Sequence, residues 1–557
     1  MEIYRQAIAE AVKQLIPVDE ITLEVPPDPK LGDLALPCFP FAAILRKNPA
    51  AIAADLKDKI GGLDFVDRID VVGAYLNFFL DRETVIRDTI EAIRSKGGAY
   101  GSSGRGRGKK ALIEHTSINP NASPHVGRAR NALIGDSIVR LMRFEGYDVC
   151  VHYFVNDIGK QIAMLVLGAE GRDDVTFGDL LDIYVDVNNR IKDDPRLEAE
   201  VFELLHRLER GDKDALERFR RVVDICIEGQ TRIFSELGIY YDVFKHESDY
   251  VASGATDEIL QRLEATGRLE RDVEGRFVLN LDGYNLPSRA PYVVLTRADG
   301  TSLYPLRDIA YTIDKVKTES EVNIVVLGED QKLYHQQVSA ALDILGYKAP
   351  VSVHYSFVLL PDGKMSTRQG TVVLLEDFMR EAVAKATEEM AKRHGEADPD
   401  TAKAVAYGAV KYAILKVANE RNVTFDWSSA LSFEGDTGPY LQYCYARINS
   451  IMRRAGGELP SSADFSRLTE DIEYELVKEL AGFPTAVSKA VDEFSPHVVA
   501  NSIYRVAKAF STFYNQCPVL NAEDPEVRDA RLLLSTAVKQ VLANGMALLG
   551  IDPVESM

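Results

Sequence analysis

Cysteine is scarce in this chain, with five residues among 557, and no two of them form a Cys-x-x-Cys pair. Such an odd, dispersed set disfavours a disulfide framework and a thiolate zinc site. Long apolar runs are also missing, because no stretch approaches the ~20 residues that a membrane-spanning helix needs. Residues 1–17 carry interspersed charges and lack the apolar core of a signal peptide. We therefore expect a cytoplasmic protein without a metal site or membrane contact.

Positive charge is in deficit as well. Lys and Arg number 65 against 85 Asp and Glu, which gives a formal net charge of −20. This acidity argues against indiscriminate binding to nucleic acid, although a local basic groove remains compatible with it. Hydrophobic residues make up 46% of the chain and charged residues 27%, as in ordinary globular proteins. The length allows several domains of about 100–200 residues each.

The chain divides into three expected domains. Residues 1–105 read as a small α+β domain, and a stretch dense in Gly and Ser, 97–108, reads as the linker that follows it. Residues 106–395 are expected to form an α/β domain with a charged helical insertion at about 165–285. The pattern from 396 to 557 is helical throughout.

The second domain opens with one βαβ unit of a nucleotide-binding sheet. Its elements follow as strand 111–114, helix 125–145 and strand 148–154. We expect the same sheet to resume at 292–295 and 323–327, where short apolar runs recur.

Two short motifs carry the chemistry. His125 and Gly127 stand where the first strand turns into its helix, and a helix N-terminus offers unpaired amides to an anion. Far along the chain, Lys364 and Arg368 flank two hydroxyl residues in a loop bordered by glycines. Such cations stabilise a leaving pyrophosphate. Taken singly, the motifs are also compatible with a packed histidine and a solvated charged loop.

Together, the motifs at 125–127 and 364–368 resemble the two signature motifs of class I aminoacyl-tRNA synthetases. Further motifs narrow the resemblance to the arginyl-tRNA synthetases; these lie at 117–120, 156–161, 299–311 and 436–443. The resemblance covers nearly the whole chain. It implies a Rossmann-type class I catalytic domain, an N-terminal α+β domain that binds the tRNA elbow, and a C-terminal all-α helical bundle that binds the anticodon.

The resemblance also implies site residues. Catalytic roles fall to His125, Gly127, Arg128, Lys364, Met365, Ser366 and Arg368, of which His125, Gly127, Arg128, Lys364 and Ser366 would bind ATP. Arginine would be bound by Glu114, Ser117, Asn119, Glu247, Tyr304, Asp308 and Gln331. Candidate tRNA contacts are Tyr75, Asn77, Tyr440, Tyr443 and Arg447, where packing within a strand or helix is the simpler alternative.

The chemistry of arginine agrees with these assignments. Its planar guanidinium has five donors that carboxylates satisfy best. Tyr304 and Asp308 are one helical turn apart and would share a face. Outside this motif, Asp308 would read as a helix cap or a surface ion pair. Glu247 lies at the edge of the variable insertion, where a structural role competes with a binding role.

The chain departs from the signature motifs at three positions. Arg128 stands where the first motif ordinarily ends in a second His, and it supplies a permanent charge. Thr367 takes the place of the usual second Lys of the other motif, with Arg368 next to it as an alternative cation. Lys364 is retained here, although many arginyl enzymes lack it.

The implied activity is ligation of L-arginine to tRNA(Arg) by way of arginyl-adenylate, with ATP as substrate and Mg²⁺ at its phosphates. The resemblance further implies that tRNA must bind before arginine is activated, and we expect a monomer without an editing domain. A catalytically silent paralogue that binds tRNA or a partner protein is the alternative that Arg128 favours. Synthetases for cysteine or glutamate fit less well, because the first needs zinc ligands and the second a cationic pocket.

Overall fold

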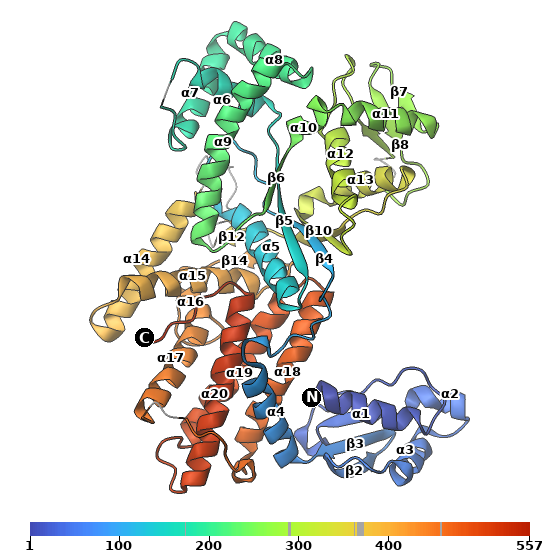
Figure 1. Ribbon diagram of the computed structural model, residues 1–557, viewed down its shortest axis with the longest axis vertical. Helices are drawn as coiled ribbons and strands as arrows, with labels where there is room; N and C mark the ends of the chain where they lie inside the picture. The colour runs from blue at the N-terminus through green and yellow to red at the C-terminus, as the bar shows by residue number, and fades with distance from the viewer. Residues whose placement is uncertain (173, 288–290, 361–362, 365–372, 457–458) are drawn as a thin grey trace.

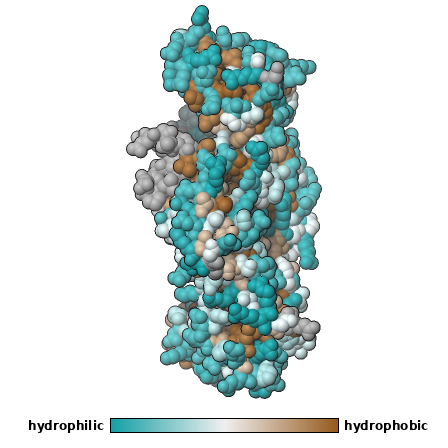
Figure 2. Space-filling model, turned by 90° about the vertical axis from the view of Figure 1, so that its left-hand side faces the viewer, coloured by the Kyte–Doolittle hydropathy of each residue, from teal (hydrophilic) through white to brown (hydrophobic). Residues whose placement is uncertain are grey.

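The computed structural model describes residues 1–172, 174–287, 291–360, 363–364, 373–456 and 459–557. It shows an elongated molecule with a parallel sheet at its centre, helical units above it, and the C-terminal helices below (Figure 1). The N-terminal part lies to one side of the C-terminal helices. On the face shown in Figure 2, hydrophilic residues predominate and hydrophobic ones gather in separate small patches. Within the described residues, no helix is long and apolar enough to cross a membrane.

The N-terminal part is a three-stranded antiparallel sheet, in the order β1-β3-β2, with helices packed on it. Its core includes the apolar face of α1. The elements are α1 (Glu2–Lys13), β1 (Leu34–Pro37), α2 (Ala42–Leu45), α3 (Pro49–Lys59), β2 (Val66–Val72) and β3 (Tyr75–Leu80), followed by α4 (Arg82–Lys96). Helix α4 leaves this domain and packs against the C-terminal helices.

The central sheet has five parallel strands in the order β11-β10-β4-β5-β6. Their bounds are β4 (Lys110–Glu114), β5 (Asp148–Val155), β6 (Val243–His246), β10 (Val322–Gly328) and β11 (Val351–Tyr355). Most of β4 is buried, as expected of a strand covered on both faces. The predicted βαβ unit and the strand near 323–327 are confirmed.

The prediction that 292–295 continues this sheet is wrong. Strand β9 (Tyr292–Val294) pairs antiparallel with β8 (Phe277–Asn280), which pairs with β7 (Leu269–Arg271) in a separate three-stranded sheet. A short apolar run indicates a strand but carries no information about its neighbours. Conversely, β6 belongs to the central sheet although it lies within the range 165–285.

Helices extend the central domain on both sides of β6. Between β5 and β6 lie α6 (Lys160–Ala169), α7 (Asp179–Asp193), α8 (Pro195–Glu209) and α9 (Lys213–Glu236), which share a core of their own. After β6 come α10 (Glu247–Ala252), α11 (Ala255–Ala265), α12 (Tyr304–Val316) and α13 (Lys332–Ile344). The two groups stand on opposite sides of the upper part of the molecule (Figure 1).

Helix α5 (Val126–Phe144) connects the sheet with the C-terminal helices. It is buried nearly all round, because it contacts β10 and β5 on one side and α15, α18 and α20 on another. The remaining elements are β12 (Val358–Leu360), β13 (Gly363–Lys364), α14 (Leu375–His394), α15 (Pro399–Leu415), β14 (Val423–Thr424), α16 (Trp427–Ala430), α17 (Gly438–Arg454), α18 (Asp471–Asp492), α19 (His497–Gln516) and α20 (Pro525–Leu548).

The Gly- and Ser-rich stretch 97–108 connects α4 to β4, and its backbone is held by hydrogen bonds and close packing. The buried carboxylate of Glu145 accepts from the Ser103 hydroxyl at 2.6 Å and from two backbone amides at 3.1 Å. At Gly106 a Cβ would lie 2.1 Å from the ring of Tyr147. In this stretch glycine permits close packing of the backbone, so the many glycines do not indicate a flexible segment.

Candidate active site and base-binding pocket

The candidate active site lies at the carboxyl edge of the central sheet, between β4 and β10. The strand order reverses between these two neighbours. From β4 the chain adds β5 and β6 on one side, and from β10 it adds β11 on the other. Ligands of open α/β sheets bind in the crevice at such a reversal point. The β4–α5 connection and the β10–α13 connection both open there.

The first signature motif forms the start of α5. His125 is the N-cap residue with extended backbone angles, and its side chain makes no capping hydrogen bond. Its Nδ1 is buried without a hydrogen-bond partner in the described part of the chain. Burial, aided by the charge of Arg128, lowers the pKa of His125, which keeps the imidazole neutral near pH 7. A neutral ring still donates from one nitrogen.

Gly127 and Arg128 shape the surroundings of that imidazole. A Cβ at Gly127 would lie 3.0 Å from His125 Nδ1, so the glycine makes room for the ring. Arg128 is exposed, and its charge offsets part of the rise that burial causes in the pKa of Tyr355. The exposed guanidinium therefore stands at the rim of the crevice as a permanent cation.

The segments on either side of the second signature motif are described, and the segment that follows it contacts the first motif. Lys364 belongs to β13, whose backbone pairs with Leu359 of β12. Met365, Ser366 and Arg368 lie outside the described residues. The chain is described again beside His125, where Val126 N donates to Val373 O at 3.1 Å and Leu375 N donates to Pro124 O at 2.8 Å. The chain that follows the second motif, from Val373 onward, thus contacts the start of α5 at one edge of the sheet.

A cavity of about 120 Å³ opens beside this edge. Five residues predicted to bind arginine line it, namely Glu114, Ser117, Tyr304, Asp308 and Gln331. Asn156, from the motif at 156–161, also lines it. Other lining residues, which the sequence did not single out, include Thr312 and Lys315 on α12 and Tyr334 and His335 on α13. The facing sides of these two helices are brought together only by the fold.

Asp308 is the carboxylate of this cavity that has no ion-pair partner among the described residues. Its Oδ2 accepts from the hydroxyl of Tyr334 at 2.9 Å, and its Oδ1 from Thr312 at 3.4 Å. Desolvation raises its pKa to about 6, although nearby Lys315 opposes the rise. Tyr304 stacks on Tyr334 with ring centroids 4.5 Å apart and closes one wall. An unpaired acid beside aromatic rings suits a cationic side chain.

Glu114 is already paired within the cavity. Lys315 Nζ donates to Glu114 Oε2, and both side chains are buried. Lys315 also lies 4.4 Å from the ring centroid of Tyr311. The Glu114–Lys315 pair has no net charge. Asp308 therefore gives the cavity one net negative charge, which complements the net positive charge of arginine.

Two residues predicted to bind arginine lie outside the cavity lining. Glu247 accepts from Arg307 Nε at 2.7 Å, and the two side chains are only 3% and 5% exposed. Burial raises the pKa of Glu247 to about 7 despite this partner. Asn119 is exposed on the neighbouring loop, where its Oδ1 accepts from Asn156 Nδ2 at 3.4 Å.

Backbone strain marks the loop that leaves β4. Thr116 and Ser117 have φ values of 73° and 42°, although neither is glycine. Thr116 N donates to Oδ1 of Asn131 on α5 at 2.5 Å, and Phe154 N donates to Ser117 Oγ at 3.1 Å. Consecutive left-handed residues persist only when their surroundings determine them, and they cluster at ligand sites.

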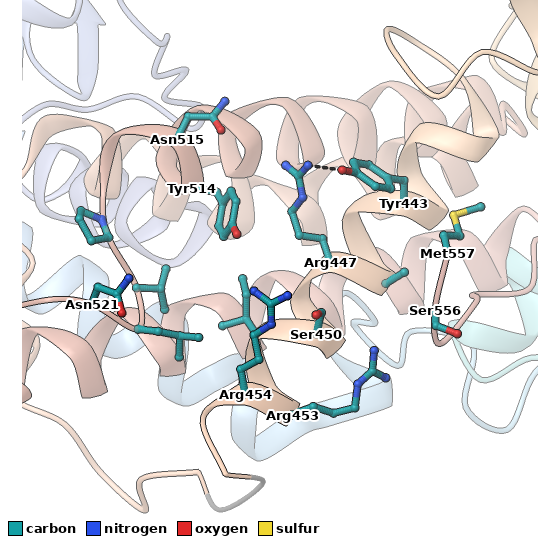
Figure 3. Close-up of a pocket in the computed structure, with 15 residues that line it drawn as sticks. Tyr443, Arg447, Ser450, Arg453, Arg454, Tyr514, Asn515, Asn521, Ser556 and Met557 are labelled. Carbon is teal, nitrogen blue, oxygen red and sulfur yellow. Dashed lines mark hydrogen bonds between the residues drawn. The ribbon is translucent and has the colours of Figure 1, made fainter. Parts of the chain in front are cut away.

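A second, larger cavity of about 700 Å³ lies between α17 and α19 (Figure 3). The Arg447 guanidinium lies 4.5 Å from the ring centroid of Tyr443 and 5.0 Å from that of Tyr514. Arg447 also donates to the Tyr443 hydroxyl. Other lining residues include Ser450, Arg453, Arg454, Asn515, Asn521, Ser556 and Met557. Aromatic faces, cations and side-chain amides are the groups that bind splayed bases of single-stranded RNA.

The other predicted tRNA contacts lie elsewhere. Tyr440 is outside this pocket, and its hydroxyl shares a hydrogen bond of 2.8 Å with Ser511 on α19. In the N-terminal domain Tyr75 is 37% exposed and meets Phe39 edge to face at 5.6 Å. Asn77, two residues along β3, is only 3% exposed, so its amide offers little surface to an RNA.

Three family profiles match the chain. The catalytic domain of "tRNA synthetases class I (R)" matches residues 89–427. The "DALR anticodon binding domain" matches residues 441–557, and the "Arginyl tRNA synthetase N terminal domain" matches residues 2–80.

Individual proteins agree with the profiles. The chain is 40% identical over 534 residues to an arginine–tRNA ligase of Methanocella arvoryzae, covering 93% of this chain and 92% of that protein. An arginine–tRNA ligase of Clostridium perfringens is 36% identical over 571 residues, with complete coverage of both chains. The solved arginyl-tRNA synthetase of Thermus thermophilus matches all of both chains with a TM-score of 0.85 and 30% identity.

Proposed function

The chain belongs to the arginyl-tRNA synthetase family and is a class I arginine–tRNA ligase, and from this premise we propose how its residues divide the work. The observation that carries the assignment is Asp308, the partly buried carboxylate without an ion-pair partner in the described chain, set against stacked tyrosines. It receives the guanidinium of L-arginine. Glu114, Ser117, Asn119 and Gln331 hold the amino and carboxylate groups of arginine or the ribose of its nucleotide partner. Glu247 acts on the cavity indirectly, because its pair with Arg307 fixes the first turn of α12, the helix that carries Asp308.

In the first step, a carboxylate oxygen of arginine attacks the α-phosphorus of ATP. The bond between the α-phosphorus and the bridging oxygen breaks, and pyrophosphate leaves with the electron pair. His125 donates to the phosphate as charge develops, helped by the amides at the start of α5. Gly127 keeps space for the ring. Arg128, Lys364, Met365, Ser366 and Arg368 belong to the machinery that binds the phosphates.

In the second step, a ribose hydroxyl at the 3′ end of tRNA(Arg) attacks the carbonyl carbon of arginyl-adenylate. The ester forms, AMP leaves, and the hydroxyl proton is released. No side-chain nucleophile takes part, so the protein acts by positioning and electrostatic stabilisation.

ATP is the nucleotide substrate, and Mg²⁺ is proposed as the ion that accompanies its phosphates. The described residues contain no group of three or more His, Cys, Asp or Glu placed to hold a metal.

The tRNA is bound at both ends of the molecule. Residues 396–557 bind the anticodon, chiefly through Tyr443 and Arg447, with Tyr440 supporting the helix that carries them. Residues 1–105 bind the tRNA elbow, with Tyr75 as its exposed contact and Asn77 behind it. Residues 106–395, with the insertion at about 165–285, carry out catalysis. One chain supplies all three regions, which supports a monomer. Its proposed location is the cytoplasm, where its substrates meet during protein synthesis.

The test is aminoacylation of tRNA(Arg) with single amino acids. We expect a charged product with arginine and none with lysine, cysteine or glutamate. Failure with every amino acid, from folded protein that still binds tRNA, would favour a catalytically silent paralogue and point to Arg128. Charging with a different amino acid would overturn the role of Asp308.

A further inference from the structure

Tyr334 connects two walls of the arginine cavity. It extends from α13, and its hydroxyl donates to Oδ2 of Asp308 on α12 at 2.9 Å. The same ring stacks on Tyr304 with centroids 4.5 Å apart and planes inclined by 27°. Tyr334 therefore contacts α12 twice: its ring stacks on Tyr304, and its hydroxyl donates to Asp308.

The two oxygens of Asp308 have different donors. Tyr334 occupies one lone pair of Oδ2, and Thr312 approaches Oδ1 at 3.4 Å. A close donor on Oδ2 and a more distant one on Oδ1 restrict rotation of the carboxylate about its terminal bond. A carboxylate has about four lone-pair sites, so acceptor sites remain for a ligand in the fixed plane.

A planar guanidinium makes two parallel hydrogen bonds only to a carboxylate in its own plane. We propose that Tyr334 is a positioning residue that fixes the carboxylate plane of Asp308 for two-pronged binding of the substrate guanidinium. This inference rests on the proposed arginine site and adds a residue that does not itself react.

The charged surroundings of Asp308 come from several elements. Lys315 on the same helix favours the ionised carboxylate, and Glu114 on β4 opposes it. Glu247 on α10 couples to Asp308 by like-charge repulsion. Tyr304 and Tyr334 remain protonated, because burial raises the pKa of the first to about 12 and that of the second well above its ordinary value. His335 stays neutral, because burial lowers its pKa to about 4.

Tyr334→Phe removes the donor and keeps the ring stack. The matched control is Tyr284→Phe, which removes a hydrogen bond of 2.7 Å from a tyrosine to Asp343, an aspartate on α13 outside the cavity. For each full-length protein, ATP–pyrophosphate exchange is measured with tRNA present, against arginine concentration and pH.

For Tyr334→Phe we expect the KM for arginine to rise about tenfold, as expected for a lost hydrogen bond to a charged group, with kcat nearly unchanged. The acid limb of kcat/KM should move to higher pH, because a lost donor raises the pKa of Asp308 above its present value of about 6. Tyr284→Phe should match the wild type in both respects.

A Tyr334→Phe enzyme with the KM and acid limb of the wild type would overturn the inference, as would an equal fall in kcat without a shift in KM. If Tyr334→Phe melts well below the wild type, Thr312→Val carries the test at the other oxygen. That variant should move the acid limb in the same direction, and an unmoved limb counts against the inference. A wild-type protein without arginine-dependent exchange would instead contradict the proposed function.

Discussion

Arg307 donates its Nε proton to Glu247 across 2.7 Å, and the two side chains are only 5% and 3% exposed. The pair joins the first turn of α12 to the first residue of α10. One acid that the sequence assigned to arginine therefore already has a guanidinium, supplied by the chain itself. Asp308, one residue after Arg307, is the acid that this pairing leaves open for substrate.

Arg307→Met should destabilise the protein strongly. It leaves the Glu247 carboxylate buried without its partner, a change that typically costs about 3–5 kcal/mol. The loss should appear as a lower urea midpoint. Arg380→Met is the control, because its pair with Asp377 is exposed, at 75% and 54%, and such pairs contribute little. Similar urea midpoints for the two variants would contradict the prediction that the buried pair contributes more to stability than the exposed pair.

His125→Ala should lower kcat of ATP–pyrophosphate exchange by about 100-fold, the usual effect of removing one donor to a developing charge. The KM for arginine should stay within about twofold, since the imidazole is assigned to phosphate. Helix stability should hardly change, because His125 makes no capping hydrogen bond. A normal kcat, or a large rise in the KM for arginine, would count against this assignment.

Arg128→His should raise the pKa of His125. The charge of Arg128 is one of the two causes that lower this pKa, and a neutral imidazole in its place removes that cause. The measurement is an NMR pH titration of ring-labelled histidines, with His125→Ala identifying the resonance. The midpoint of His125 should move upward, and an unchanged midpoint would show that burial alone sets it.

Arg447→Ala should weaken tRNA binding and reduce its salt dependence. The guanidinium lies against two aromatic rings in an open pocket, where a lost base contact costs about 1–3 kcal/mol. Because the substitution removes one cation from the interface with the RNA phosphates, the slope of log K against log salt should fall by about one. Arg196→Ala, an 89% exposed arginine on α8, serves as the control. Equal tRNA affinities for the two variants would contradict the assignment of this pocket to the RNA interface.

Some parts of this site follow from sequence, because they are local. The four-residue spacing of Tyr304 and Asp308 predicts a shared helical face, and both line the cavity. The strand-to-helix turn at His125 follows from an apolar run, a polar loop and a periodic helix. These signals lie within a few residues of one another.

The remaining parts depend on contacts between distant segments. Arg307 and Glu247 pair across 60 residues, and Tyr334 reaches Asp308 from the next helix. Neither pairing leaves a local pattern. The glycines at 97–108 likewise predict a linker, but they do not reveal its packing partners, such as Tyr147.

The most direct test is the arginine dependence of ATP–pyrophosphate exchange by Asp308→Asn, measured with tRNA present. Asp314→Asn, on the same helix and paired with Lys245 outside the cavity, is the control. We expect Asp308→Asn to lose at least about 100-fold in kcat/KM for arginine, as for a lost charged hydrogen-bond partner, with the KM for ATP unchanged. A KM for arginine equal to that of the wild type would contradict the assignment of Asp308 as the residue that reads the guanidinium.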